Sequence, residues 1–231
     1  MADRCLLYYI TDRSQLRGDE QDRRSALLAK VADAARAGVD YIQLRERDLS
    51  ARELETLARD VQTAVRNGAL LRTENRERRS GAEPRTRILI NSRTDVALAA
   101  GVDGVHLRGD DLTPDEVRQM LKDSARSPTA CHFLVAASCH SNEDVKRAES
   151  EAVDFAVFAP VFGKSNAPGT QAAGVAALHD ACQRKIPVFA LGGVTMENAQ
   201  SCLNAGAAGI AGIRLFQENK IEDVVRALRA L

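Results

Sequence analysis

The sequence contains no tryptophan and only 4% aromatic residues, which leaves little material for the stacking platforms that bind nucleic acid. Lys plus Arg and Asp plus Glu are both 32, so no net charge favours nucleic acid or an anionic membrane as the main partner. No stretch approaches the roughly 20 apolar residues of a membrane span, and the N-terminus lacks the features of a signal peptide. We therefore expect a cytoplasmic protein.

Cysteine and histidine are too scattered to form a structural framework. The five cysteines are odd in number and contain no C-x-x-C pair, and there are only four histidines. This pattern argues against a disulfide-linked fold or a structural zinc site, and is typical of reduced thiols in a cytosol.

The sequence does contain a buried strand that ends in charge. Residues 39–44 form a largely apolar run in which Asp40 is the one charged residue, and four charged residues, 45–48, follow them. Burying so many charges in a core would be prohibitive, so this strand must end at a polar cavity or at solvent. Ser50 and Glu53 then form a capping box that predicts the start of a helix. Together these features predict one βα unit of an α/β protein with its site at the carboxyl end of the strand.

The same pattern recurs along the chain. Eight strands are predicted, nearly all followed by polar or glycine residues and separated by helical segments: 6–10, 39–44, 88–90, 104–107, 133–137, 155–158, 188–191 and 209–213. Alternating strands and helices indicate a parallel sheet. At 231 residues, eight units favour one single-domain (β/α)8 TIM barrel over 1–231, with a doubly wound open sheet as the alternative.

One segment interrupts this rhythm. Residues at about 72–87 are nearly devoid of apolar side chains and rich in charge. Such a segment buries too little surface to order itself, so we expect an exposed and mobile insertion before the third strand.

Two groups of residues suggest a phosphate site. Gly192 and Gly193 follow the seventh strand, where barrels commonly bind phosphate, although a glycine pair can also serve only to allow a tight turn. Gln43, Arg45 and Arg47 are spaced two apart, so all three side chains can face the mouth of the barrel and bind one anion. Lys164, on the loop after the sixth strand, can close over that anion as a point charge. In the alternative interpretation, Arg45 pairs with Glu46 and Lys164 is a solvated loop residue.

Further candidates follow the fourth and fifth strands. Asp110 and Asp111 can bind Mg²⁺, or can merely cap the helix that follows them. Ser138, Cys139 and His140 suggest a nucleophile and a base, but adjacent strand residues point to opposite faces, which makes Cys139 and His140 a poor pair. We expect His106 to be a packed or hydrogen-bonded residue of the fourth strand.

The motifs in their order resemble the thiamine-phosphate synthase family and its relative, the thiazole tautomerase TenI. The resemblance runs from the first strand to the eighth and rests on 9–12, 43–48, 104–106 with 110–111, 138–140, 160–162 and 190–194. It implies transfer of hydroxymethylpyrimidine from its diphosphate to thiazole phosphate, with Mg²⁺ as cofactor and release of pyrophosphate.

The resemblance also implies roles for individual residues. It assigns the diphosphate to Gln43, Arg45, Arg47 and Asn91, and the metal to Asp111 with Ser92. It assigns the pyrimidine to Ser138 and the leaving group to Lys164. The thiazole phosphate is assigned to Gly193, Ile213 and Arg214.

Three positions depart from the family pattern. Ser92 stands where the family has a carboxylate, Arg47 replaces a lysine, and the loop around Lys164 lacks the usual threonines, which leaves the alignment of Lys164 open. The alternatives to the synthase are a tautomerase that needs no metal, with His140 as its acid-base residue, and a catalytically silent phosphate-binding barrel. Ser92 favours the tautomerase, whereas Gln43 and the Asp110–Asp111 pair favour the synthase.

Overall fold

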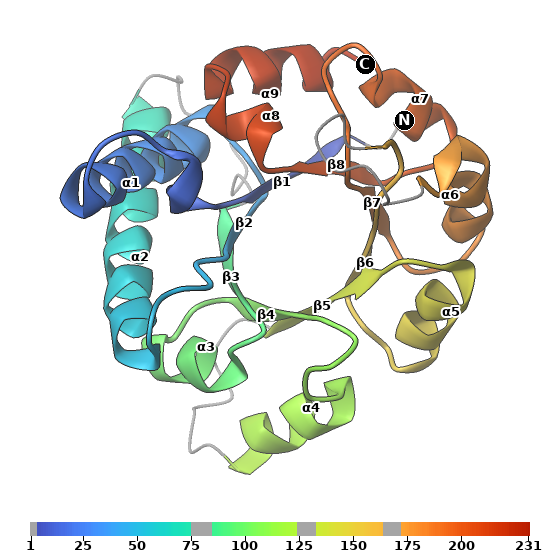
Figure 1. Ribbon diagram of the computed structural model, residues 1–231, viewed down its shortest axis with the longest axis horizontal. Helices are drawn as coiled ribbons and strands as arrows, with labels where there is room; N and C mark the ends of the chain where they lie inside the picture. The colour runs from blue at the N-terminus through green and yellow to red at the C-terminus, as the bar shows by residue number, and fades with distance from the viewer. Residues whose placement is uncertain (1–3, 75–84, 124–132, 164–171) are drawn as a thin grey trace.

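Eight parallel strands close into a barrel in the order in which they occur in the chain (Figure 1). The structure is a computed structural model, and it describes residues 4–74, 85–123, 133–163 and 172–231. The strands are β1 Leu6–Ile10, β2 Tyr41–Leu44, β3 Arg87–Asn91, β4 Gly104–Leu107, β5 Leu134–Cys139, β6 Phe155–Phe158, β7 Val188–Ala190 and β8 Gly209–Gly212. The predicted (β/α)8 barrel is confirmed, and the open-sheet alternative is wrong because β8 pairs with β1.

Helices surround the barrel (Figure 1). They are η1 Arg13–Gln15, α1 Glu20–Ala37, α2 Ala51–Glu74, α3 Thr94–Ala100, α4 Pro114–Asp123, α5 Asn142–Ser150, α6 Gly174–Cys182, α7 Ala199–Asn204, α8 Arg214–Gln217 and α9 Ile221–Arg229. The predicted capping box before α2 is present, because Ser50 N–H donates to Glu53 and Glu53 N–H donates to the Ser50 hydroxyl. The segment predicted to be an exposed, mobile insertion is regular at its two ends, since residues 72–74 continue α2 and Arg87 begins β3. Most of that prediction falls on residues 75–84, which lie outside the described part.

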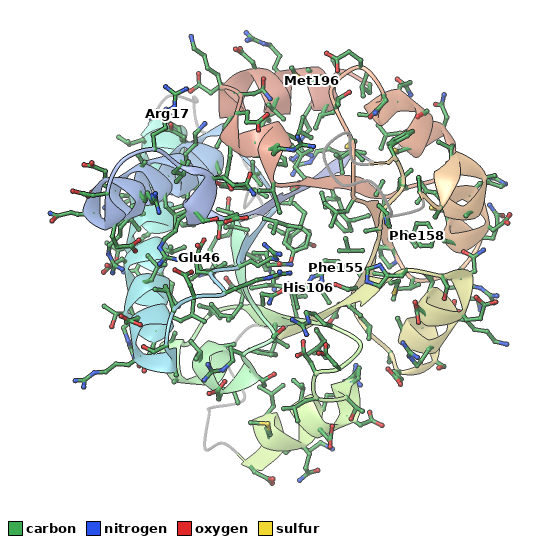
Figure 2. The ribbon with its side chains drawn as sticks, in the orientation of Figure 1. Arg17, Glu46, His106, Phe155, Phe158 and Met196 are labelled. Carbon is green, nitrogen blue, oxygen red and sulfur yellow. The ribbon has the colours of Figure 1, made fainter. Side chains whose placement is uncertain are left out.

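Alternation along the strands separates two apolar cores. One face of each strand packs against the surrounding helices, and Phe158 of β6 belongs to this outer core. The other face fills the inside of the barrel, which includes Phe155 of the same strand. Figure 2 shows His106 and Phe155 inside the ring of strands and Phe158 between the strands and the helices.

Four aromatic rings form a layer across the inside of the barrel. Tyr8, Tyr41, Phe155 and Phe189 contact one another with ring centroids 5.0 to 5.9 Å apart. Such tilted and edge-on contacts are the favoured geometry for aromatic pairs. Because this layer fills the barrel interior, the polar inward-facing residues nearer the carboxyl ends of the strands lie above an apolar floor.

Three aspartates tie neighbouring strands together at the opposite end. Asp40, Asp103 and Asp154 precede β2, β4 and β6, and their Oδ2 atoms accept the backbone N–H groups of Leu7, Ile88 and Val135 at 2.8, 2.9 and 2.7 Å. Each carboxylate therefore joins the start of an even-numbered strand to the strand before it. The device repeats at every second strand from β2 to β6, whereas Ala208 precedes β8.

Candidate active site

The inward-facing polar residues at the mouth form a continuous hydrogen-bonded chain. Gln43 Nε2 donates to the Tyr8 hydroxyl at 3.0 Å, that hydroxyl lies 3.2 Å from His106 Nδ1, and His106 Nε2 lies 2.8 Å from Ser138 Oγ. The chain links β2, β1, β4 and β5. Gln43, Tyr8 and His106 are buried, and Ser138 is partly exposed. His106 is therefore a hydrogen-bonded strand residue, as predicted.

The surroundings of His106 keep its ring neutral. Burial, with a contribution from the nearby Arg45 charge, lowers the pKa of His106 to about 3. Neither side chain bonded to the ring is a carboxylate that could stabilise an imidazolium. A neutral imidazole carries one proton, so one of its nitrogens donates a hydrogen bond and the other accepts one.

Several arginine side chains lie close together at the carboxyl ends of β2 and β4. Arg45 is largely buried, with 19% of its side chain exposed, and its nearest carboxylate, Asp12, is 3.8 Å away. Burial, together with the neighbouring charges of Arg47 and Arg108, lowers the pKa of Arg45. Asp12 also accepts hydrogen bonds from Ser14 and Gln15. The charge on Arg45 is thus only weakly neutralised within the fold, which favours an anion at this position.

Glu46 points away from this group of arginines. Its Oε2 atom accepts the Arg13 backbone N–H at 3.0 Å and contacts the Arg13 guanidinium at 3.2 Å, and its Oε1 atom accepts the Thr11 hydroxyl at 2.6 Å. The alternative interpretation that pairs Arg45 with Glu46 is therefore wrong, because adjacent residues at a strand end point to opposite sides. Thr11 Oγ1 also accepts the Arg45 backbone N–H at 3.1 Å, so the pair formed by Arg13 and Glu46 supports the segment that carries Arg45.

Asn91 and Ser92 form a tight turn at the end of β3. The Asn91 side chain donates to the Ser92 hydroxyl at 3.0 Å, and the Ser92 backbone N–H donates to the carbonyl of His106 at 2.9 Å. Ser92 has φ 63°, a left-handed conformation that is uncommon for residues other than glycine, asparagine and aspartate. This turn places both predicted site residues beside the strand that carries His106.

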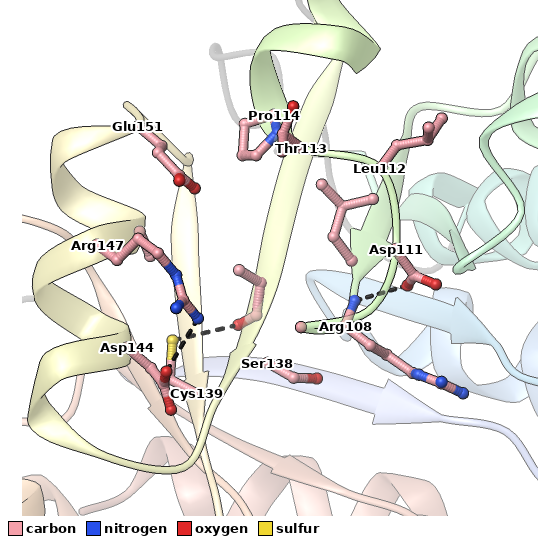
Figure 3. Close-up of a pocket in the computed structure, with 14 residues that line it drawn as sticks. Arg108, Asp111, Leu112, Thr113, Pro114, Ser138, Cys139, Asp144, Arg147 and Glu151 are labelled. Carbon is pink, nitrogen blue, oxygen red and sulfur yellow. Dashed lines mark hydrogen bonds and ion pairs between the residues drawn. The ribbon is translucent and has the colours of Figure 1, made fainter.

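The loop after β4 holds the candidate metal ligand. Asp111 Oδ2 accepts the Arg108 backbone N–H at 2.6 Å, whereas Asp110 pairs with the Arg108 side chain and this hydrogen bond lowers the pKa of Asp110. Asp111 and Ser138 line a cavity of about 240 Å³ between this loop, β5 and α5 (Figure 3). The lining includes no residue of β2 or β3, so the cavity lies on the β4 and β5 side of the barrel.

Cys139 and His140 do not form a nucleophilic pair. Figure 3 shows Cys139 beside Asp144 and Arg147 of α5, whereas Ser138 points away from that helix. Burial raises the pKa of the Cys139 thiol to about 12, which makes the thiolate scarce at neutral pH. His140 is exposed, and its Nδ1 atom lies 2.7 Å from the carbonyl of Ala159. The structure therefore places Ser138 in the mouth and leaves His140 on the loop after β5.

The glycine pair after β7 allows two loops to approach closely. Gly192 and Gly193 have φ 93° and 66°, and a Cβ atom on them would lie 2.7 Å from Pro160 and 2.8 Å from Phe162. Packing therefore requires both glycines. Within the described chain the backbone N–H groups of Gly193 and Ile213 make no hydrogen bond, so these two donors are available to an anion.

The loop after β8 is fixed to the loop after β1. Gln217 of α8 accepts the Asp12 N–H at 2.9 Å and donates to the Asp12 carbonyl at 3.0 Å. Arg214 is exposed at the start of α8. Two of the candidates for the thiazole phosphate, Ile213 and Arg214, thus lie at the start of the helix that is tied to Asp12, the carboxylate nearest Arg45. Lys164 lies outside the described residues.

The sequence reasoning missed the contribution of Tyr8, His106 and Arg108 to this site. The alternation that placed Gln43 inside the barrel also places Tyr8 and His106 there, so part of the signal was present. The strand register, which brings the end of β1 beside β2 and the end of β4 beside β5, decides which of these side chains meet.

The closed barrel of eight parallel strands with surrounding helices defines the protein as a (β/α)8 barrel, with arginines and, within the described residues, unbonded backbone N–H groups at the carboxyl ends of its strands. A family model described as thiamine monophosphate synthase matches residues 7–216. The chain belongs to this family.

Two curated relatives cover nearly the whole chain. A putative thiamine-phosphate synthase of Geobacter sulfurreducens is 40% identical over 228 residues, 97% of this chain and 93% of the relative. The putative thiamine-phosphate synthase 2 of Aquifex aeolicus is 36% identical over 213 residues, 92% of this chain and 97% of the relative.

The solved structures agree on the fold. Thiamine phosphate pyrophosphorylase from Pyrococcus furiosus has a TM-score of 0.75 at 23% identity, covering 99% of this chain and 96% of its own. A 3-hexulose-6-phosphate synthase has a TM-score of 0.65 at 17% identity, covering 97% of this chain and 98% of its own. Within the described residues, no helix is both long and apolar enough to cross a membrane.

Proposed function

We propose that this protein is a thiamine-phosphate synthase, a transferase that joins hydroxymethylpyrimidine diphosphate to thiazole phosphate and releases pyrophosphate. Membership of the family supports this activity, and so do the relatives that carry the name. The observation in the structure that best supports it is the weakly neutralised Arg45 beside Arg47 and Arg108. A diphosphate is the kind of ligand that such a group of guanidinium groups stabilises.

The arginines are proposed to act on the leaving group. Breaking the carbon–oxygen bond to the diphosphate leaves negative charge on the departing pyrophosphate, and Arg45 and Arg47 stabilise that charge as it develops. Because Arg45 is largely buried, its interaction with the diphosphate is screened less by water than that of an exposed arginine. Lys164 stays a prediction for the same role, and Asn91 and Gln43 are proposed to hold the diphosphate from the β3 and β2 sides.

The two other substrate groups are proposed to lie on either side of the arginines. Ser138 holds the pyrimidine above the aromatic layer, and this layer keeps water away from the cation that forms when the diphosphate leaves. The backbone N–H groups of Gly193 and Ile213, with Arg214, hold the thiazole phosphate. These positions bring the thiazole nitrogen and the pyrimidine carbon together within one mouth.

The residues present fit Mg²⁺ bound together with a diphosphate. Among the described residues no group of three or more His, Cys, Asp or Glu side chains could hold a metal ion alone. Mg²⁺ commonly takes only one or two protein carboxylates and fills its coordination from phosphate oxygens and water. Asp111 would supply the carboxylate and Ser92 a hydroxyl, and the ion would neutralise part of the diphosphate charge.

The test is to incubate the purified protein with both synthase substrates and Mg²⁺, and to follow thiamine phosphate and pyrophosphate together. Equal formation of the two products supports the proposal. Isomerisation of the thiazole without pyrophosphate release would instead identify a tautomerase. Binding of thiazole phosphate with no turnover would identify a silent phosphate-binding barrel.

A further inference from the structure

The hydrogen-bonded chain in the barrel contains two residues that the proposed substrate contacts leave unexplained. Tyr8 and His106 lie between Gln43 and Ser138, and both are almost completely buried, with 0% and 2% of their surface exposed. Burying a phenol and an imidazole in an apolar barrel carries a cost unless their hydrogen bonds are made. Both side chains make their hydrogen bonds here. The positions of the Tyr8 and His106 protons determine whether Ser138 can donate a hydrogen bond to a ligand.

The direction of donation along the hydrogen-bonded chain from Gln43 to Ser138 follows from counting the protons on each side chain. Gln43 donates an N–H to the Tyr8 oxygen, so the single Tyr8 proton is free to point at His106 Nδ1. His106 Nδ1 then accepts, and the one proton of the neutral ring lies on Nε2. Nε2 in turn donates to Ser138 Oγ, 2.8 Å away. The Ser138 proton is then available to a group in the mouth.

We infer that Tyr8 and His106 are positioning residues that hold the Ser138 hydroxyl as a hydrogen-bond donor toward the substrate. The substrate atom that meets Ser138 is then a lone-pair acceptor, such as a ring nitrogen, rather than an amino group. This identification of the acceptor rests on the proposed function. The direction of the chain does not, because it is a property of the protein without ligand.

If the hydrogen bonds were donated in the opposite direction, from Ser138 toward Gln43, Ser138 would have a different chemical role. If the Gln43 amide were turned so that its oxygen faced Tyr8, the Tyr8 proton would point to Gln43, and His106 would carry its proton on Nδ1. Nε2 would then accept the Ser138 proton and activate the serine, as a base activates a nucleophile. The Gln43 amide therefore controls whether Ser138 binds a substrate atom or acts as a nucleophile.

The first test measures the tautomer directly. In protein labelled with ¹⁵N-histidine at neutral pH, we expect His106 to show a protonated, pyrrole-type Nε2 and an unprotonated, pyridine-type Nδ1, with the signals identified by their loss in His106→Asn. A protonated Nδ1 with a bare Nε2, or a doubly protonated ring, would overturn the inference. This experiment needs no substrate, so it remains decisive even if the protein lacks synthase activity.

The second test uses two adjacent tyrosines as a matched pair. Tyr8 and Tyr9 are both fully buried on β1, but Tyr9 faces the outer core, and its hydroxyl has no hydrogen-bond partner in the described chain. We expect Tyr8→Phe to lower kcat/KM for the pyrimidine substrate about 10-fold, the effect of losing one ordered hydrogen bond. KM for thiazole phosphate should not change, and Tyr9→Phe should leave both values unchanged.

A double-mutant cycle separates positioning from general damage to the barrel. If Tyr8 acts through Ser138, adding Tyr8→Phe to Ser138→Ala should change kcat/KM less than about 2-fold, because the hydroxyl it positions is already absent. A further 10-fold loss in the Ser138→Ala background would mean that Tyr8 acts independently of Ser138, and would overturn the positioning role. Equal losses from Tyr8→Phe and Tyr9→Phe would overturn it as well.

Discussion

At the amino ends of the strands, buried carboxylates each have several close partners within the fold, whereas at the carboxyl ends the largely buried Arg45 has only one distant carboxylate partner among the described residues. Asp40 joins the Leu7 N–H, Arg4 and Arg229, and Asp103 joins the Ile88 N–H and Arg85. Arg45 at the other end has its nearest carboxylate at 3.8 Å. The charges that hold the barrel together are neutralised by the protein itself, whereas the charge on Arg45, which we propose binds the diphosphate, is only weakly neutralised by the protein.

The largest effect should come from the amino end. Asp40→Ala removes a carboxylate that is 8% exposed and leaves Arg229, the Leu7 N–H and Arg4 without their partner. Breaking such a buried pair costs about 3 kcal/mol. We expect urea unfolding to show this loss, with kcat per folded molecule unchanged below the melting transition. Asp40→Asn, which keeps an acceptor for Leu7, should lose less. A fall in kcat without a loss of stability would contradict the division between the two ends.

The corresponding change at the carboxyl end should have the opposite profile. Arg45→Ala removes a largely buried cation that the fold only weakly neutralises, so the free energy of unfolding should stay the same or rise. Turnover should fall about 100-fold, because a charge-assisted bond to the diphosphate is lost. Thermal melting and kcat/KM of the same preparation test both parts. A destabilised protein with normal turnover would show that Arg45 is structural.

The carboxyl-end half of this contrast could be predicted in part from the sequence, since alternation along the second strand placed Gln43 and Arg45 toward the mouth, and the family resemblance assigned Ser138 to the site. The partners could not be predicted in the same way. Glu46 pairs with Arg13, 33 residues earlier, because strand register and the η1 turn bring the two together. The chain through Tyr8 and His106 depends on the same register. The sequence-based prediction for the glycine pair was also incomplete, because the close approach of Gly192 and Gly193 to Pro160 and Phe162 appears only in the folded structure.

An effect of intermediate size is expected from Ser92, a residue at the carboxyl end of β3 that departs from the family pattern. Ser92→Asp should lower the Mg²⁺ concentration for half-maximal rate about 5-fold, because it adds a second carboxylate to the proposed metal ligands. The left-handed backbone, φ 63°, suits aspartate better than serine. Ser92→Asn is the matched control, since it shares the backbone preference without the charge and should leave the Mg²⁺ requirement unchanged.

A binding experiment tests the same change without substrate. Titration of Mn²⁺ by electron paramagnetic resonance should show tighter binding in Ser92→Asp alone. A shared gain in both variants would point to backbone relief rather than to metal ligation.

The smallest effect concerns the turns that lead into the even-numbered strands. Gly38, Gly101 and Gly206 lie in the turns between the preceding helices and β2, β4 and β8 with φ of 91°, 73° and 99°, and Ala152 lies in the turn before β6 with φ 52°. A left-handed alanine costs about 1 to 2 kcal/mol, partly offset by the greater freedom of glycine in the unfolded chain. Ala152→Gly should therefore raise the free energy of unfolding by about 0.5 to 1 kcal/mol. Gly101→Ala, the reverse change in the turn before β4, should lower it by a similar amount, and neither variant should alter kcat, because both turns lie at the amino end. Chemical denaturation of the pair measures this directly. Ala152→Gly would lose stability instead if the carbonyl of Ala152, which accepts a hydrogen bond from Arg118, needs the stiffer residue to stay in place.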